Sequence, residues 1–160
     1  LAPELARFPN LVLLRTLSKA WALAGARCGV AVAAPEIIEL LQRVRAPYPV
    51  STSAMDDVLS VLRREGSFAL EERVRTIVAE RQRLALALAA VPDVLEVFPS
   101  EANFLLMRMR DAAAAERRCL AAGIVVRNRS SALGLHNCVR VSVGTAEENH
   151  ALVGALRDRR

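Results

Sequence analysis

Lysine is almost absent from this 160-residue chain, although basic residues are abundant. Of its 22 lysine and arginine residues, only Lys19 is a lysine, and the formal net charge is +5. GC-rich coding explains a general excess of arginine, but it does not explain why a lysine is kept at this one position. Arginine stays protonated in proteins, whereas lysine can lose its proton and react as an amine nucleophile. Lys19 is therefore a candidate for a chemical role.

Aromatic residues and long apolar runs are also scarce. The chain has one Trp and one Tyr, so it offers few platforms on which nucleic-acid bases would stack. Its basic residues are scattered and often stand beside acids, as in Glu71-Glu72-Arg73 and Glu80-Arg81, which predicts solvated helix faces rather than a binding patch. No apolar stretch reaches the roughly 18 residues of a membrane span. We therefore expect neither a nucleic-acid partner nor a membrane.

Three widely spaced cysteines form no CxxC or Cys/His cluster, so we expect no metal site. An odd number of cysteines favours reduced thiols and a cytoplasmic location. Because the chain begins with Leu rather than Met, we expect a processed chain or a fragment of a longer protein.

Apolar periodicity predicts an α/β fold, since strands and helices are mixed along the chain. We expect strands at 11–16, 28–33, 94–98, 103–109, 124–127 and 139–143, and helices at 35–45, 53–64, 69–90, 112–122 and 145–157. Gly66 separates two of these helices, and a capping box formed by Thr145 and Glu148 opens the last one. The prolines of APYPVSTS, residues 46–53, exclude a regular helix and predict a domain junction. The later elements are expected to form a small α/β sandwich with helices on one sheet face.

The strongest local motif combines Thr16, Ser18 and Lys19 with Arg27 further along. A phosphorylated aldehyde cofactor needs an amine for its aldehyde and hydrogen-bond donors for its phosphate. Lys19 supplies the first, and the two hydroxyls and the guanidinium supply the second. The preceding strand would deliver the lysine to a strand–loop edge, where α/β proteins bind ligands. The alternative is an ordinary surface lysine beside an N-capping serine.

The segment TLSKAWALAGARCG resembles the cofactor-lysine segment of class I/II aminotransferases of pyridoxal-phosphate fold type I. The resemblance continues through APYPVSTS, VFPSEANFLLMR, GIVVRNRS and NCVRVSVGTAEEN. Together these blocks resemble the C-terminal part of the histidinol-phosphate aminotransferases over nearly the whole chain. The resemblance implies the end of the large cofactor-binding domain at 1–48, followed by the small C-terminal α/β sandwich domain at 49–160.

This resemblance implies pyridoxal 5'-phosphate as cofactor, Lys19 as the lysine that bonds it and moves a proton, and Thr16, Ser18 and Arg27 around its phosphate. It implies that Arg140 binds the substrate α-carboxylate and that Arg127 lies near the substrate phosphate. Asn103 falls in a block near the active site. The alternatives are a cross-strand acid as the partner of Arg140, and an ordinary exposed arginine at position 127.

The implied reaction moves an amino group between histidinol phosphate and 2-oxoglutarate, giving glutamate, in a homodimer. In this family, three features of the active site come before the lysine segment in the chain. They are the acid that pairs with the pyridine nitrogen, an aromatic residue that stacks on the cofactor ring, and a Gly/Ser loop that binds the phosphate. We therefore expect the 160-residue chain to be inactive alone. Open alternatives are a related aminotransferase or threonine-phosphate decarboxylase, or an inert truncated product or folding module.

Overall fold

The computed structural model describes residues 2–158, and the chain divides into two compact units, Leu1–Arg73 and Val74–Arg160. The division lies within a helix, whereas the sequence predicts a junction at 46–53. In the structure, residues 45–51 are the non-helical connection between two helices. Assigning 1–48 and 49–160 to a large and a small domain stays a prediction. No helix among the described residues combines the length and apolarity of a membrane span.

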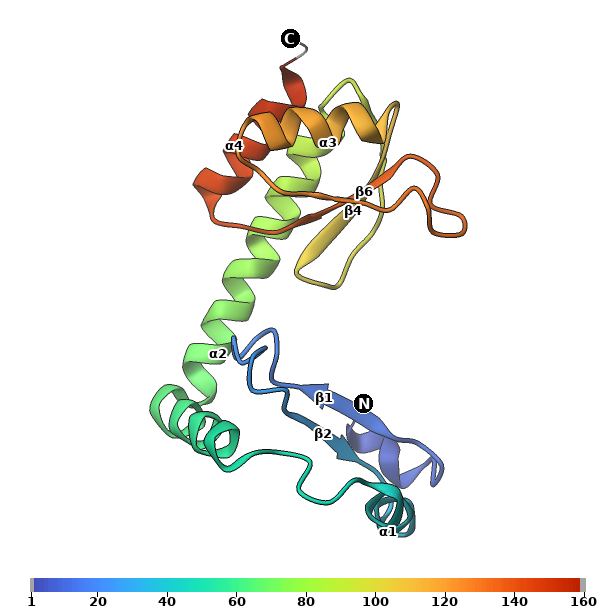
Figure 1. Cartoon of the computed structure of the whole chain (residues 1–160), viewed down its shortest axis with the longest axis vertical. Helices are drawn as coiled ribbons and strands as arrows, with labels where there is room; N and C mark the ends of the chain where they lie inside the picture. Colours follow the sequence, from blue (N-terminus) through green and yellow to red (C-terminus); the bar gives the residue numbers. More distant parts are fainter. Residues whose placement is uncertain (1, 159–160) are drawn as a thin grey trace. The chain divides into compact units, whose positions relative to one another are not determined.

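The first unit is built around a two-stranded antiparallel sheet (Figure 1). Its elements are the 3-10 helix η1 (Ala2–Ala6), β1 (Leu13–Thr16), β2 (Gly29–Val32), α1 (Pro35–Val44) and the first part of α2 (Thr52–Ala89). Leu13 pairs with Val32 and Thr16 with Gly29. The two strands and the first helix predicted from the sequence are confirmed, and residues 17–28 form the loop that joins the strands.

The apolar side chains of this unit are poorly covered by the described residues. Helix α1 begins with Pro35 in its first turn, where proline costs no hydrogen bond. It nevertheless buries none of its residues. Leu14 of β1 is 78% exposed and Val44 of α1 is 81% exposed. The first unit therefore has apolar surfaces that its own described residues do not cover.

Helix α2 bends at Gly66, which confirms the predicted break between two helices. Gly66 has φ 62° and ψ −177°, a backbone conformation that is open to glycine but costly for residues with a Cβ atom. The residues on either side are helical, so one residue turns the chain between two helical segments.

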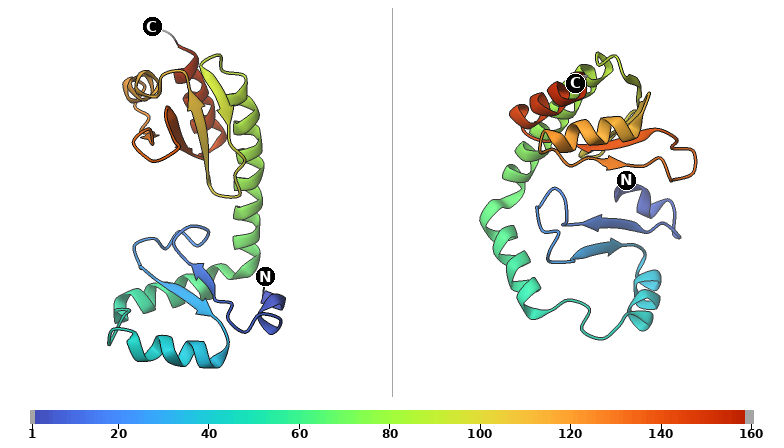
Figure 2. Two further views of the ribbon diagram at one scale, coloured as in Figure 1. Left: turned by 90° about the vertical axis from the view of Figure 1, so that its right-hand side faces the viewer. Right: turned by 45° about the horizontal axis from the view of Figure 1, so that its top comes forward.

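The second unit is a two-layer α/β sandwich, as the sequence predicts. Its antiparallel sheet has the order β3-β4-β6-β5. The strands are β3 (Val94–Val97), β4 (Phe104–Met109), β5 (Arg127–Asn128) and β6 (Cys138–Ser142), and the helices α3 (Ala112–Ala121) and α4 (Ala146–Arg157) join the end of α2 (Figures 1 and 2). The core contains Leu84 and Leu88 of α2, Met107 of β4, Val139 of β6 and Leu156 of α4. Alternate strand residues therefore face the helices, and the others form an open sheet face.

Local signals set the ends of these helices. Asp111 caps α3 by accepting a hydrogen bond from the Ala114 backbone at 2.9 Å, and this bond lowers the pKa of Asp111. The capping box of Thr145 and Glu148 is present, as predicted. The strand predicted at 124–127 is wrong over its first residues, because only Arg127–Asn128 pair with β6. Ile124 instead donates its backbone N–H to Cys119 at the end of α3 (2.8 Å), which uses that donor for helix termination.

Candidate functional site

Lys19 lies in the loop between β1 and β2, with an exposed side chain. The antiparallel pairing continues one step into this loop, since the Leu17 backbone N–H donates to the Cys28 carbonyl at 3.3 Å. Ser18 stands near the start of this loop and Arg27 near its end, and Lys19 directly follows Ser18. Residues that the sequence assigns to phosphate binding therefore lie at both ends of the loop.

The hydroxyls of Thr16 and Ser18 form a pair at the base of this loop. Thr16 Oγ1 donates to Ser18 Oγ at 2.8 Å and accepts the Ser18 backbone N–H at 3.1 Å. Arg27 donates from Nη1 to the Ala24 carbonyl at 3.0 Å, and its side chain is exposed. Ala22 and Arg27 have positive φ values of 57° and 51°. Such conformations are unfavourable for residues other than glycine and are enriched at functional sites.

This set fits the chemical demands of a phosphorylated aldehyde. The amine, the two hydroxyls and the guanidinium belong to one loop and its stems. The close hydroxyl pair also shows that Thr16 and Ser18 point to the same place.

Arg73 of α2 also contacts the loop at residues 17–28, which carries Lys19 and which we call the lysine loop. The sequence alone does not indicate this contact. It donates from Nη1 to the Ala20 carbonyl at 2.8 Å and from Nη2 to Glu65 Oε2 at 2.7 Å. The hydrogen bond from Arg73 lowers the pKa of Glu65. The prediction that the Glu71-Glu72-Arg73 stretch is simply a solvated helix face is wrong for Arg73, whose side chain is 35% exposed.

Arg127 and Arg140 meet in the second unit. They are directly paired residues of the neighbouring antiparallel strands β5 and β6, so their side chains emerge from the same sheet face. The other cross-strand neighbour of Arg140 is Leu106. No carboxylate forms an ion pair with either arginine within residues 2–158. The alternative of a cross-strand acid beside Arg140 is therefore wrong.

The guanidinium of Arg140 lies over an aromatic ring instead. Its Cζ atom is 5.1 Å from the centroid of the Phe104 ring, within the range of a cation–π contact. An aromatic ring stacks on the flat face of a guanidinium, and this leaves the N–H groups at the edge of the guanidinium able to donate hydrogen bonds. Two like charges opposite each other repel, and a shared anion would relieve that repulsion. This arrangement is suited to binding a carboxylate or a phosphate.

Asn103 is exposed and directly precedes β4. Its carbonyl accepts the backbone N–H of Val143 at 3.0 Å, which joins the start of β4 to the end of β6. Arg81 of α2 holds the same turn by donating to the Ala102 carbonyl at 3.0 Å and to Glu101 at 3.3 Å. The predicted solvated face at Glu80-Arg81 is wrong, since these residues are only 9% and 8% exposed.

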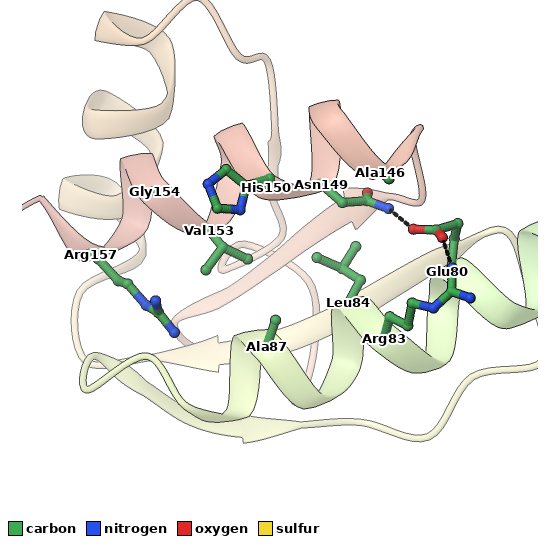
Figure 3. A pocket seen from close by; sticks show the side chains of 10 residues that line it. All are labelled: Glu80, Arg83, Leu84, Ala87, Ala146, Asn149, His150, Val153, Gly154 and Arg157. Carbon is green, nitrogen blue, oxygen red and sulfur yellow. Dashed lines mark hydrogen bonds and ion pairs between the residues drawn. The ribbon is translucent and has the colours of Figure 1, made fainter.

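A pocket of about 410 Å³ lies between the second part of α2 and α4 (Figure 3). Leu84, Ala87 and Val153 give it an apolar floor. Its one acid, Glu80, is bonded to Arg83 and to Asn149. None of the candidate site residues lines it, so we assign it no catalytic role.

The cysteines and acids add no further candidate centre. Cys28, Cys119 and Cys138 are free thiols. Among the residues that the structure describes, no group of three His, Cys, Asp or Glu side chains is arranged to hold a metal ion.

Comparison with known proteins gives consistent matches over almost the whole chain. The model of the family "Aminotransferase class I and II" matches residues 2–156. A histidinol-phosphate aminotransferase of Escherichia coli O157:H7 is 45% identical over 157 residues, which are 98% of this chain and 44% of that protein. The chain thus spans less than half the length of the curated relatives it matches.

Solved structures agree on the fold. The histidinol-phosphate aminotransferase of Clostridium acetobutylicum is similar with a TM-score of 0.85 at 22% identity, over 98% of this chain and 47% of that one. The enzyme of the same name from Sinorhizobium meliloti, solved in complex with pyridoxal-5'-phosphate, gives a TM-score of 0.76 at 27% identity, over 93% of this chain and 40% of that one. The predicted relation to fold type I aminotransferases is confirmed.

Proposed function

Since this chain belongs to the class I and II aminotransferase family, we propose that it carries the cofactor lysine and the anion-binding arginines of a histidinol-phosphate aminotransferase. The complete enzyme would transfer an amino group between histidinol phosphate and 2-oxoglutarate in histidine biosynthesis. The similarity to histidinol-phosphate aminotransferases over 98% of the chain supports this choice of substrate. The structural observation that carries it is the unneutralised pair of Arg127 and Arg140.

The lysine loop provides the proposed contacts with pyridoxal 5'-phosphate. Lys19 would supply the amine that bonds the aldehyde and, once the amine of the substrate has displaced it, would hold and move a proton at Nζ. Thr16, Ser18 and Arg27 supply donors for the phosphate, and the 2.8 Å hydroxyl pair supports their acting together. The bound cofactor would supply an electron sink, which makes the α-proton of the amino substrate removable.

The arginine pair provides the proposed contacts with substrate anions. Histidinol phosphate has a phosphate ester where an amino acid has its α-carboxylate, so one anion subsite can receive both partners of the exchange. Arg140 would bind the carboxylate of glutamate or 2-oxoglutarate, and Arg127 would add the second guanidinium that a phosphate favours. Bidentate binding by planar guanidiniums suits both anions. Asn103, at the start of β4, is proposed to lie near the same substrate.

We further propose that the 160-residue chain has no transaminase activity by itself and works as part of a homodimeric cytoplasmic enzyme. The chain covers 44% of the length of its relatives. The exposed apolar residues of the first unit, such as Leu14 and Val44, support the idea that further polypeptide covers them. In this scheme residues 1–48 belong to the large cofactor-binding domain and 49–160 to the small domain.

The proposed function is tested by assaying the complete enzyme with histidinol phosphate and 2-oxoglutarate, and the 160-residue chain in parallel. We expect glutamate to form only with the complete enzyme. Turnover by the short chain would contradict the proposed inactivity. Failure of the complete enzyme to use histidinol phosphate, while it uses another amino donor, would contradict the proposed substrate.

A further inference from the structure

We propose that Arg73 is a positioning residue for the cofactor lysine, because it fixes the backbone of the lysine loop from α2. This inference rests on the proposed role of Lys19. Arg73 is far from that loop in sequence, and its guanidinium makes two directed contacts at once. One is to the Ala20 carbonyl, in the residue that follows Lys19, and the other is to the Glu65 carboxylate.

The position of the Arg73 guanidinium is itself determined by the bend in α2. Gly66 turns the chain with a left-handed φ of 62°. Glu65 stands immediately before this bend, and Arg73 stands on the helical segment after it. The 2.7 Å ion pair between them ties the two segments together. The guanidinium is therefore held from one side by Glu65 while it bonds the loop with its other nitrogen.

The carbonyl of Lys19 and that of the next residue, Ala20, both accept hydrogen bonds. The carbonyl of Lys19 accepts the Ala22 backbone N–H at 2.9 Å, within the loop, and the carbonyl of Ala20 accepts Arg73 Nη1 at 2.8 Å. Only the second bond reaches outside the loop to a helix. The direction in which the Lys19 side chain leaves the backbone depends on the conformation of the turn at residues 19–22, which both bonds hold. Loss of the Arg73 bond would let the 19–22 turn change orientation.

Charge strengthens this contact compared with an ordinary backbone hydrogen bond. A guanidinium bonded to a carbonyl forms a charge-assisted bond, roughly twice as strong as a neutral one. Arg73 also fits the role better than a lysine would, since its planar fork serves the carbonyl and the carboxylate with different nitrogens. A lysine at this position could bond the carbonyl but would lose the fixed geometry.

Amide hydrogen exchange in the complete enzyme tests the contact directly. In Arg73→Met, which keeps an apolar stem, we expect exchange at the Ala22 and Leu23 amides to become about tenfold faster. Arg73→Lys should recover part of the protection, and Glu65→Gln should give a smaller increase than Arg73→Met. Arg63→Met, an exposed arginine on the same helix, is the matched control and should leave both amides unchanged. Equal exchange in Arg73→Met and the parent enzyme overturns the inference, whether or not cofactor binds.

The circular dichroism of added pyridoxal phosphate provides a readout of lysine orientation. We expect Arg73→Met to keep an absorption band that depends on Lys19 but to lose at least half of the induced dichroism of that band, with partial recovery in Arg73→Lys. Unchanged dichroism in Arg73→Met would overturn the positioning role. A band that persists in Lys19→Arg would instead contradict the proposed function, while the exchange experiment still decides whether Arg73 fixes the loop.

Discussion

Asn149 of α4 donates its amide Nδ2 to the buried carboxylate of Glu80 in α2, at 3.1 Å (Figure 3). The same side chain bonds both the N–H and the carbonyl of Gly144, at 3.0 and 3.1 Å. One amide thus connects α2 to the turn between β6 and α4. Because β6 carries Arg140, this network helps to fix the strand that holds a proposed substrate contact.

Replacing Asn149 with Ala should destabilise the second unit. The change removes hydrogen bonds from the buried Glu80 carboxylate and from both backbone groups of the half-buried Gly144. A buried polar group left unsatisfied costs about 1–3 kcal/mol. We expect a clearly lower midpoint of thermal unfolding. The control is His150→Ala, because His150 is the next residue in the chain and its side chain is exposed. This change should alter the stability little. A midpoint equal to that of the parent would show that water replaces the amide.

Cys28 should react with an alkylating reagent before the two buried cysteines, Cys119 and Cys138. Cys119 is fully buried, and this burial raises the pKa of its thiol. A raised pKa keeps the reactive thiolate scarce in the folded state, so modification of Cys119 must await unfolding or a pH well above the usual thiol range. Cys28 is half-buried in the lysine loop. Mass spectrometry of peptides after mild iodoacetamide treatment should find Cys28 modified first, and early modification of Cys119 would contradict the buried core.

The same linkage makes the Cys119 contribution to stability depend on pH. Its folded pKa is raised above the usual 9.0, so the unfolded chain loses this proton at a lower pH than the folded chain does. The folded state is therefore favoured below about pH 9 and loses this contribution as the pH rises through the folded value. A Cys119→Ala variant should therefore lose less stability between pH 8 and 10 than the parent, as measured by the midpoint of chemical unfolding at both pH values. An equal loss in the two proteins would contradict this contribution of the Cys119 thiol.

Lys19→Arg in the complete enzyme should abolish the absorption band of lysine-bound cofactor. A guanidinium cannot condense with the aldehyde, although it keeps the positive charge. The spectrum with added pyridoxal phosphate measures this directly. Arg15→Lys, on the neighbouring strand, is a useful companion because it supplies a new amine close in sequence. If the band survives in Lys19→Arg, another amine bonds the cofactor.

Sequence reasoning worked where a local pattern determines the structure. The capping box at Thr145, the break at Gly66 and the strand predicted at 103–109 depend on neighbouring residues, and the structure contains all three. It failed where distant contacts decide. Arg73 and Arg81 look like any charged helix residue, yet each bonds a carbonyl in a remote turn.

The candidate site shows the same division. The composition isolated Lys19, and the resemblance to aminotransferases added Arg127 and Arg140. Neither indicated that these arginines would be paired across two strands, because β5 and β6 are joined by a loop whose length does not fix the register. The cation–π contact of Arg140 with Phe104 likewise required the pairing of β4 with β6. Such relationships come from strand register, which one sequence does not specify.

The last prediction separates the two arginines by their substrates. A charge-assisted hydrogen bond contributes about 1.5–3 kcal/mol, so each loss should lower kcat/KM by about 10- to 150-fold. In the complete enzyme, Arg140→Ala should impair histidinol phosphate and the 2-oxo acid acceptor alike, because both need the anion contact over Phe104. Arg127→Ala should lower kcat/KM for histidinol phosphate more than for an unphosphorylated aromatic amino acid, since a phosphate makes fuller use of a second guanidinium.

The measurement is kcat/KM for both donors in both variants. The control is Arg129→Ala, because Arg129 lies beside the same strand. An equal loss for both donors in Arg127→Ala would remove its phosphate role and weaken the choice of histidinol phosphate. Such a result would leave the aminotransferase family untouched, because membership rests on the match over residues 2–156 and not on this side chain.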